Sequence, residues 1–238
     1  MSELTESVSR MIREFEKLPG IGKKSAERIA YHLLKLDKQE ALALANSITA
    51  VKENVRYCKH CYNLAEDTLS AAVHKPNDDA LSDAVHKSND GALSDTAHKS
   101  NGGVLCEICK DPRRNQSLLC VVEQPQDLIM LEQTRRYEGL YHVLLGRLSP
   151  LDRITPDQLT IAALIERVKS GTFDEIVMGT NPTVDGDSTA YYIIGQLELL
   201  PNKPKITRLA RGITTGSDLQ FANKEMLADA LSERQEMR

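Results

Sequence analysis

The sequence predicts a multi-domain α/β protein, in which a helical N-terminal region and a four-cysteine module precede a parallel sheet with helices on both faces. Three observations predict it. Apolar residues recur at helical spacing up to residue 56, two Cys-x-x-Cys pairs bound the next segment, and strand-like apolar runs alternate with helical stretches from residue 118 onward. Because such alternation is typical of parallel sheets, we expect domains at 1–56, 57–112 and 113–238.

Composition narrows the class of protein. Apolar residues make up 41% of the 238 residues and charged residues 27%, as in ordinary globular proteins. No apolar run approaches a membrane span, and the start has no apolar signal-like core, so we expect a cytoplasmic protein that binds no membrane. The net charge is −4, yet residues 1–60 carry 11 Lys and Arg against 8 Asp and Glu. This basic segment favours a small DNA contact, although a solvated helix face is the alternative.

In the first region, two helical patterns flank the turn Leu18-Pro19-Gly20-Ile21-Gly22, and another helix is expected to begin near Lys23. Glycines leave room for a phosphate to reach backbone N–H groups, and a helix N-terminus adds donors and a positive dipole end. Such contacts position a protein on DNA without reading its sequence. The alternative is a plain helix–helix turn with a glycine cap. The motif resembles the helix-hairpin-helix of DNA repair proteins, and the predicted DNA-binding residues are Gly20, Gly22, Lys23, Lys24 and Arg28.

The second region is bounded by two cysteine pairs, Cys58 with Cys61 and Cys106 with Cys109. Two such pairs supply four thiolates for a closed tetrahedral zinc site, which is structural because no position is left open for substrate. A chain without an export signal favours metal ligation over disulfides. The fifth cysteine, Cys120, lies in an apolar strand and is expected in the core.

Between the cysteine pairs, three segments align at a period of twelve residues: 68–79, 80–91 and 92–103. Removing the predicted insert 69–104 would leave an ordinary finger loop. Lengthening that loop costs only about 1.5 kcal/mol, whereas a structural zinc contributes roughly 10–16 kcal/mol. The recurring His74, His86 and His98 suggest a metal site, but a helical step of twelve would turn them to three different sides. The polar, turn-rich composition favours a weakly structured insert.

The third region places acids at the carboxyl ends of two predicted strands, where ligands gather in open parallel sheets. Glu123 ends the first strand, and 181–187 follows the third. This arrangement resembles a Toprim domain, in which a strand-ending Glu and a later Asp-x-Asp hold magnesium. Here Asn181 and Thr183 stand at the Asp-x-Asp positions, so two metal ligands are missing and we expect neither magnesium nor catalysis. The remaining Asp185 and Asp187 are alternatively ordinary acids at a helix N-terminus.

Taken together, the motifs resemble the RecR family of bacterial recombination mediators. The resemblance rests on LPGIGKKSAERIAYHLL, the four cysteines, DPRRNQSLLCVVEQPQDLIMLEQT, LLGRLSPLDRI, GTNPTVDGDSTAYYI and RLARGITTGSDL, which cover nearly the whole chain except 69–104. It implies a nucleoid-associated protein that helps RecO and RecF load recombinase at gapped or single-stranded DNA. It also implies a ring-shaped tetramer around DNA and a Toprim contact with RecO, for which we expect Glu123, Asp185 and Asp187 to serve. The repeats depart from the family and put the usual geometry of the zinc module in doubt.

Two rival functions remain. A Toprim-type magnesium-dependent nuclease or primase-like enzyme would use Glu123, Asp185 and Asp187, but the missing carboxylates disfavour it. A sequence-specific zinc-finger regulator would need a recognition helix, and the flanks of the cysteine pairs show none. We therefore expect a scaffold and not an enzyme.

Overall fold

The computed structural model describes residues 5–67, 103–213, 216, 218–232 and 234. The predicted insert therefore lies outside the described residues, apart from Gly103 and Val104. The chain forms two compact units, Met1–Val55 and Arg56–Arg238.

The first unit is helical, as predicted, with α1 (Glu6–Glu16), α2 (Lys23–Leu33) and α3 (Lys38–Asn54). Its small core joins Ile12 of α1 to Ala26 and Ala30 of α2, and the two alanines let the helix backbones approach closely. Asp37 caps α3, because its carboxylate accepts a hydrogen bond from the backbone N–H of Glu40 at 2.8 Å.

The second unit is built on a four-stranded parallel sheet in the order β4-β3-β5-β6. All four strands lie where the apolar runs predict them. Their bounds are β3 (Asn115–Val122), β4 (Gly139–Val143), β5 (Glu175–Met178) and β6 (Lys205–Arg208). In the central register, Val121 of β3 lies between His142 of β4 and Met178 of β5. The C-terminal half of β3 is fully buried, because it has neighbours on both sides and side chains packed on both faces.

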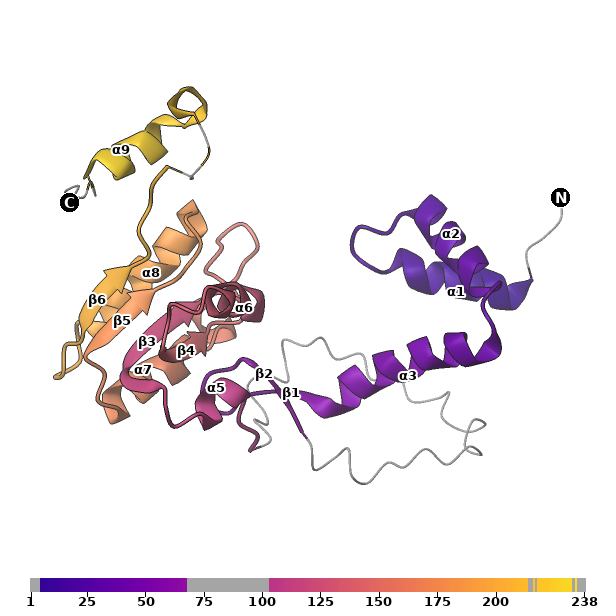
Figure 1. Ribbon diagram of the computed structural model, residues 1–238, viewed down its shortest axis with the longest axis horizontal. Helices are drawn as coiled ribbons and strands as arrows, with labels where there is room; N and C mark the ends of the chain where they lie inside the picture. The colour runs from indigo at the N-terminus through magenta and orange to yellow at the C-terminus, as the bar shows by residue number, and fades with distance from the viewer. Residues whose placement is uncertain (1–4, 68–102, 214–215, 217, 233, 235–238) are drawn as a thin grey trace. The chain divides into compact units, whose positions relative to one another are not determined.

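Successive side chains of β3 point to opposite faces of the sheet and enter two separate cores. Leu119 and Val121 pack with α7 (Ile161–Ser170) and α8 (Val184–Leu197), whereas Cys120 and Val122 pack with Leu128 of α6 (Pro125–Gln133). The helices therefore cover both faces, as Figure 1 shows. This unit also contains η1 (Pro156–Gln158), η2 (Leu219–Phe221) and α9 (Lys224–Ser232).

The four-cysteine module belongs to the same compact unit as the sheet. It contains β1 (Val55–Tyr57), β2 (Leu64–Glu66) and the short helix α5 (Glu107–Lys110). Tyr62 and Ile108 of the module pack against the same core as α6. One face of the sheet is thus shared between a helix and the module, an arrangement that the strand–helix pattern does not predict.

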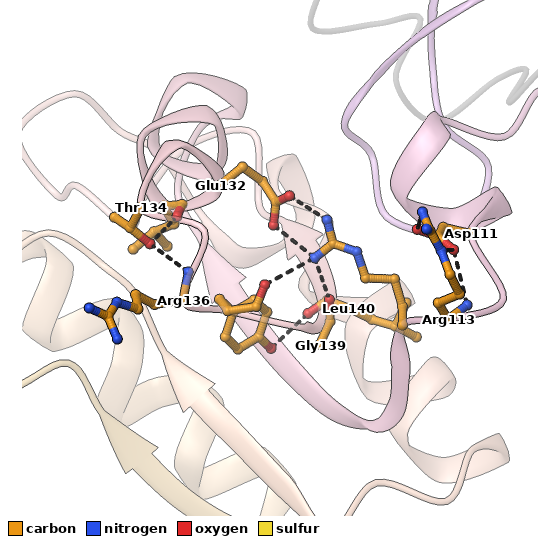
Figure 2. Close-up of polar contacts among 10 residues, drawn as sticks. Asp111, Arg113, Glu132, Thr134, Arg136, Gly139 and Leu140 are labelled. Atoms are coloured by element: carbon orange, nitrogen blue, oxygen red, sulfur yellow. Dashed lines mark hydrogen bonds and ion pairs between the residues drawn. The ribbon is translucent and has the colours of Figure 1, made fainter.

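A partly buried arginine joins the start of β3 to its neighbours around Glu132 and Gly139 (Figure 2). Both terminal nitrogens of Arg114 pair with the carboxylate of Glu132 at the end of α6. Arg114 Nη1 also donates to the carbonyls of Tyr137 and Gly139, at 3.2 and 3.3 Å, ahead of and at the start of β4. This charge-assisted cluster fixes the return of the chain from α6 into the edge strand.

Candidate nucleic-acid interface and four-cysteine centre

The predicted DNA-binding residues gather around the turn between α1 and α2. Gly20 has a φ of +77°, which only glycine adopts without strain, and the Ile21 N–H donates to the Leu18 carbonyl at 3.1 Å to close the turn. Apart from its own chain neighbours, no atom of the described residues lies within 4 Å of a Cβ built on Gly20 or Gly22, so both backbones border open space.

The helix α2 begins at the predicted residue, with Gly22 as its extended N-cap. No acid occurs in its first turn, so no carboxylate there neutralises the positive end of the helix. Lys23, Lys24 and Arg28 are all exposed. The turn can therefore offer backbone N–H groups and three cationic side chains to an approaching phosphate.

The four paired cysteines come together as the spacing predicts. Their sulfur atoms all lie within 4.8 Å of one another, and three of the four side chains are buried, with Cys109 at the margin. The Tyr62 N–H donates to the Cys58 carbonyl at 3.0 Å, and the Lys110 N–H donates to the Cys106 carbonyl at 3.1 Å. Each pair is thus a tight turn whose thiols face the other pair.

Hydrogen bonds among the four cysteine side chains lower the pKa of two thiols and raise the pKa of the other two. Those to Cys106 and Cys109 hold the pKa of Cys58 far below its ordinary value, and the bond with Cys109 lowers the pKa of Cys106 to about 7. The bonds to Cys106 in turn raise the pKa of Cys61 and that of Cys109. Thiolates are the form that binds metal, so this donor set is compatible with a structural zinc ion.

The module also braces the edge of the sheet. The Val143 N–H of the outer strand β4 donates to the Cys61 carbonyl at 2.8 Å. Arg167 of α7 donates through Nη1 to the carbonyls of His60 and Tyr141, at 3.2 and 2.7 Å. The first cysteine turn therefore satisfies backbone groups of an edge strand that would otherwise be open for pairing.

At the carboxyl rim of the sheet, Glu123 is 2% exposed and its carboxylate is already bound. Asn181 donates its backbone N–H to Oε1 at 2.8 Å and its side-chain amide to Oε2 at 2.9 Å. A Cβ at Gly186 would lie 2.7 Å from Glu123 Oε1 and 2.2 Å from the Asn181 carbonyl oxygen, so glycine is required for this close packing. The expected contact of Glu123 with a partner conflicts with this burial, because its charge is used inside the protein.

The two positions that lack carboxylates have structural uses. Asn181 holds Glu123, and the Thr183 hydroxyl caps α8 by accepting the Gly186 N–H at 3.1 Å. Sequence reasoning missed a third participant, Arg147. It lies 3.7 Å from Glu123 Oε2 through Nη1 and 3.6 Å from Asp185 Oδ2 through Nε. The Arg147 guanidinium and the Asn181 amide thus lie beside these carboxylates, whereas a Toprim metal site needs carboxylate oxygens that are accessible to the ion.

Comparison with known proteins agrees with both ends of the chain. The family model described as "RecR, helix-hairpin-helix" matches residues 8–52, and the one described as "Toprim domain" matches 117–210. Recombination protein RecR of Rhodopirellula baltica is 48% identical over the whole of both chains, and that of Rubrobacter xylanophilus is 39% identical over the same extent. The RecR of Chloroflexus aggregans is 38% identical over 97% of this chain and 94% of its own. The chain belongs to the RecR family.

In this RecR family member, the helix-hairpin-helix match spans α1 to α3 up to residue 52, and the Toprim match spans β3 to β6. The family membership and the architecture expected from the sequence are therefore confirmed, and they support a role in recombination and repair. Within the described residues, no helix has both the length and the apolar character needed to cross a bilayer.

The last predicted site residue of this RecR family member is also paired. Asp187 forms an ion pair with Arg211, which follows β6 and comes within 4.0 Å of Asp229 on α9. Asp185 and Asp187 both occupy the first turn of α8, where acids favour the helix dipole. Arg147 and Arg211 each come a few residues after a strand, which is the sequence signal that could have indicated them.

Proposed function

We propose that the chain is a non-catalytic, DNA-binding mediator in recombinational repair, which assists RecO, with RecF as a further partner, in loading recombinase at gapped or single-stranded DNA. The proposal that the chain is not an enzyme rests on the Glu123 carboxylate, both oxygens of which already accept hydrogen bonds. Two amide donors and the nearby Arg147 occupy the groups that a metal-dependent Toprim enzyme would keep for its ion. A protein of this kind acts at the nucleoid as a homo-oligomer, for which the family implies a ring tetramer.

The enzyme alternative is tested directly. The purified protein, incubated with gapped DNA and Mg²⁺ or Mn²⁺, is expected to leave the DNA uncut and unextended. It should nevertheless shorten the lag of recombinase loading on gapped DNA coated with single-strand-binding protein when RecO is present. Metal-dependent cleavage that disappears in Glu123→Gln would establish the enzyme reading instead.

The helix-hairpin-helix is proposed to bind duplex DNA through phosphates. Lys23→Glu combined with Arg28→Glu reverses two exposed charges beside the open glycine turn, so duplex affinity should fall by at least about tenfold at low salt. The matched control is Lys35→Glu with Lys38→Glu, which makes the same charge change elsewhere in the helical unit. Equal binding by wild type and the first variant would leave the turn with only a structural role.

We further propose that the four cysteines hold one structural zinc ion per chain, since four facing thiols form a complete tetrahedral set without an open position. Elemental analysis of the native protein should give one zinc per chain. A purified, folded protein that contains no zinc would contradict this assignment.

The contact with RecO is proposed to use Asp185 and Asp187, whose side chains are 32% and 34% exposed, whereas Glu123 supports the loop from beneath. Exposed charges at an interface act mainly on the rate of association and are screened by salt. We therefore expect Asp185→Asn with Asp187→Asn to slow RecO association mainly at low salt. Surface-bound RecO in a kinetic binding assay provides the measurement. Unchanged association rates would move the contact to another face.

A further inference from the structure

A groove of about 600 Å³ lies between the first cysteine turn and the end of α7, on the part of the second unit that carries β4. Its walls come from segments far apart in the sequence. The turn contributes Lys59, His60 and Tyr62, and the end of α7 with the loop after it contributes Arg167 and Phe173. Figure 1 shows β1, β2 and α5 of the module beside the α7 end of the sheet.

The side chains of this groove are presented by a fixed backbone. Lys59 and His60 are the two residues between Cys58 and Cys61, so the buried four-cysteine cluster fixes the backbone on both sides of them. The Lys59 N–H donates to the Val104 carbonyl at 3.0 Å, and Arg167 holds the His60 carbonyl at 3.2 Å. Little backbone entropy would therefore be lost when a ligand enters.

Rings and cations share this groove. Tyr62 lies against His142 with ring centroids 5.4 Å apart, which fixes its ring from behind. The guanidinium of Arg167 lies over Phe173 at 5.8 Å from the ring centroid. Arg167 donates both carbonyl hydrogen bonds through the same nitrogen, Nη1. These bonds and the Phe173 ring together fix the orientation of its guanidinium plane.

This combination fits single-stranded nucleic acid. Aromatic rings and arginine planes stack on unpaired bases of any sequence, while lysine and arginine pair with the backbone. In a duplex the base faces are already stacked, so the rings would gain nothing from it. Among the described residues that line the groove, Glu166 is the single acid against the two cations, and Gln116, Ser170 and Thr172 can hydrogen-bond to base or sugar edges.

We propose that this groove, which we call the turn–α7 groove, binds a short stretch of single-stranded DNA, with bases stacked on its rings and phosphates beside Lys59. The proposal rests on the DNA-binding function proposed above and adds to it a second contact of different specificity. The helical unit is proposed to take duplex DNA, whereas the groove would take single-stranded DNA.

The test compares charge and ring variants with a matched control. Lys59→Glu and His60→Ala change exposed side chains within the groove. Lys110→Glu makes the same charge reversal beside the other cysteine pair, outside the groove. Binding is measured by fluorescence anisotropy with a labelled oligothymidylate of about 20 nucleotides, long enough for one such groove. Each groove variant should lose about fivefold or more in affinity, while Lys110→Glu and duplex binding stay at the wild-type level.

Two further measurements keep the result decisive if a groove variant loses zinc. An abasic strand of the same length keeps the phosphates but removes the stacking, so it should bind wild type at least about fivefold more weakly. Photo-crosslinking of wild type to a strand containing 5-iododeoxyuridine should label Tyr62 or Phe173.

Crosslinks confined to the helical unit, or an abasic strand bound as tightly as oligothymidylate, would overturn the proposal. So would zinc-replete groove variants that bind oligothymidylate normally but lose a protein partner, since the groove would then be a peptide site. Loss of duplex binding in the Lys23 and Arg28 double variant is a separate readout. The helix-hairpin-helix function therefore stands or falls independently of the groove.

Discussion

The four-cysteine centre and the acidic rim of the sheet both carry side chains of types that bind metals, and they differ in what surrounds the potential ligand atoms. In the first, four sulfur atoms face one another within 4.8 Å. In the second, the carboxylate of Glu123 faces an amide and that of Asp187 faces an arginine. Ligand residues alone therefore do not make a metal site; the groups opposite them must also leave their charge unsatisfied.

The largest expected effect comes from removing a thiolate. Cys58→Ser should abolish zinc binding and lower the free energy of unfolding by about 4 kcal/mol or more, because the module also holds β4 through the Cys61 carbonyl. Cys120→Ser is the matched control, since Cys120 is buried in the sheet but lies outside the cluster. It should lose some stability and keep its zinc, as measured by elemental analysis and urea unfolding. Equal zinc content in the two variants would contradict the assignment of Cys58 as a zinc ligand.

The second prediction concerns a substitution that should give the acidic rim some capacity to bind a metal ion. Asn181→Asp removes the amide donor to Glu123 and places a second carboxylate beside it, which should cost about 2–3 kcal/mol at neutral pH. Millimolar Mg²⁺ should recover part of this loss in the variant and leave the wild type unchanged in thermal unfolding. Asn202→Asp, at an exposed position, is the control. A wild-type protein stabilised by Mg²⁺ as strongly as the variant would show that the native rim binds metal.

A smaller effect concerns His142, which is buried where the module meets β4. Burial, and then the nearby Arg167, lowers its pKa to about 3. The ring bonds Thr160 through Nε2 at 3.0 Å, and within the described part of the chain its Nδ1 has no hydrogen-bond partner. The folded state therefore resists a proton that the unfolded chain accepts near pH 6.5, so stability is complete above that pH and decreases as the pH falls toward 3.

Between pH 7.0 and 5.5 this difference should cost the wild type about 1 kcal/mol. His142→Gln should have a flatter dependence over the same range, measured by urea unfolding with zinc content checked at both pH values. Parallel curves for the two proteins would exclude His142 as the acid-sensitive group.

The smallest effect is expected from the repeats. Deleting 68–103 should leave zinc content, thermal unfolding and duplex binding within experimental error, because the cluster closes from residues outside the three repeats. Val104 must be kept, although the predicted insert 69–104 includes it, since its carbonyl accepts the Lys59 N–H and its side chain packs on the cysteines. A shortened protein that loses zinc would make the repeats part of the centre.

The sequence by itself determined the helices up to residue 54, the four parallel strands and the meeting of the four cysteines, because local periodicity and close pair spacing encode them. Only the tertiary structure decided which acids of the rim are paired inside the protein and which are accessible to a partner. Arg147 and Arg211 are distant in sequence from the acids they neutralise, and the burial of Glu123 depends on a glycine more than 60 residues later. The packing of the cysteine turn against β4, and with it the turn–α7 groove, likewise arises from contacts between segments separated by the insert. Pairing across such distances is set by how the chain folds back on itself, which no local pattern records.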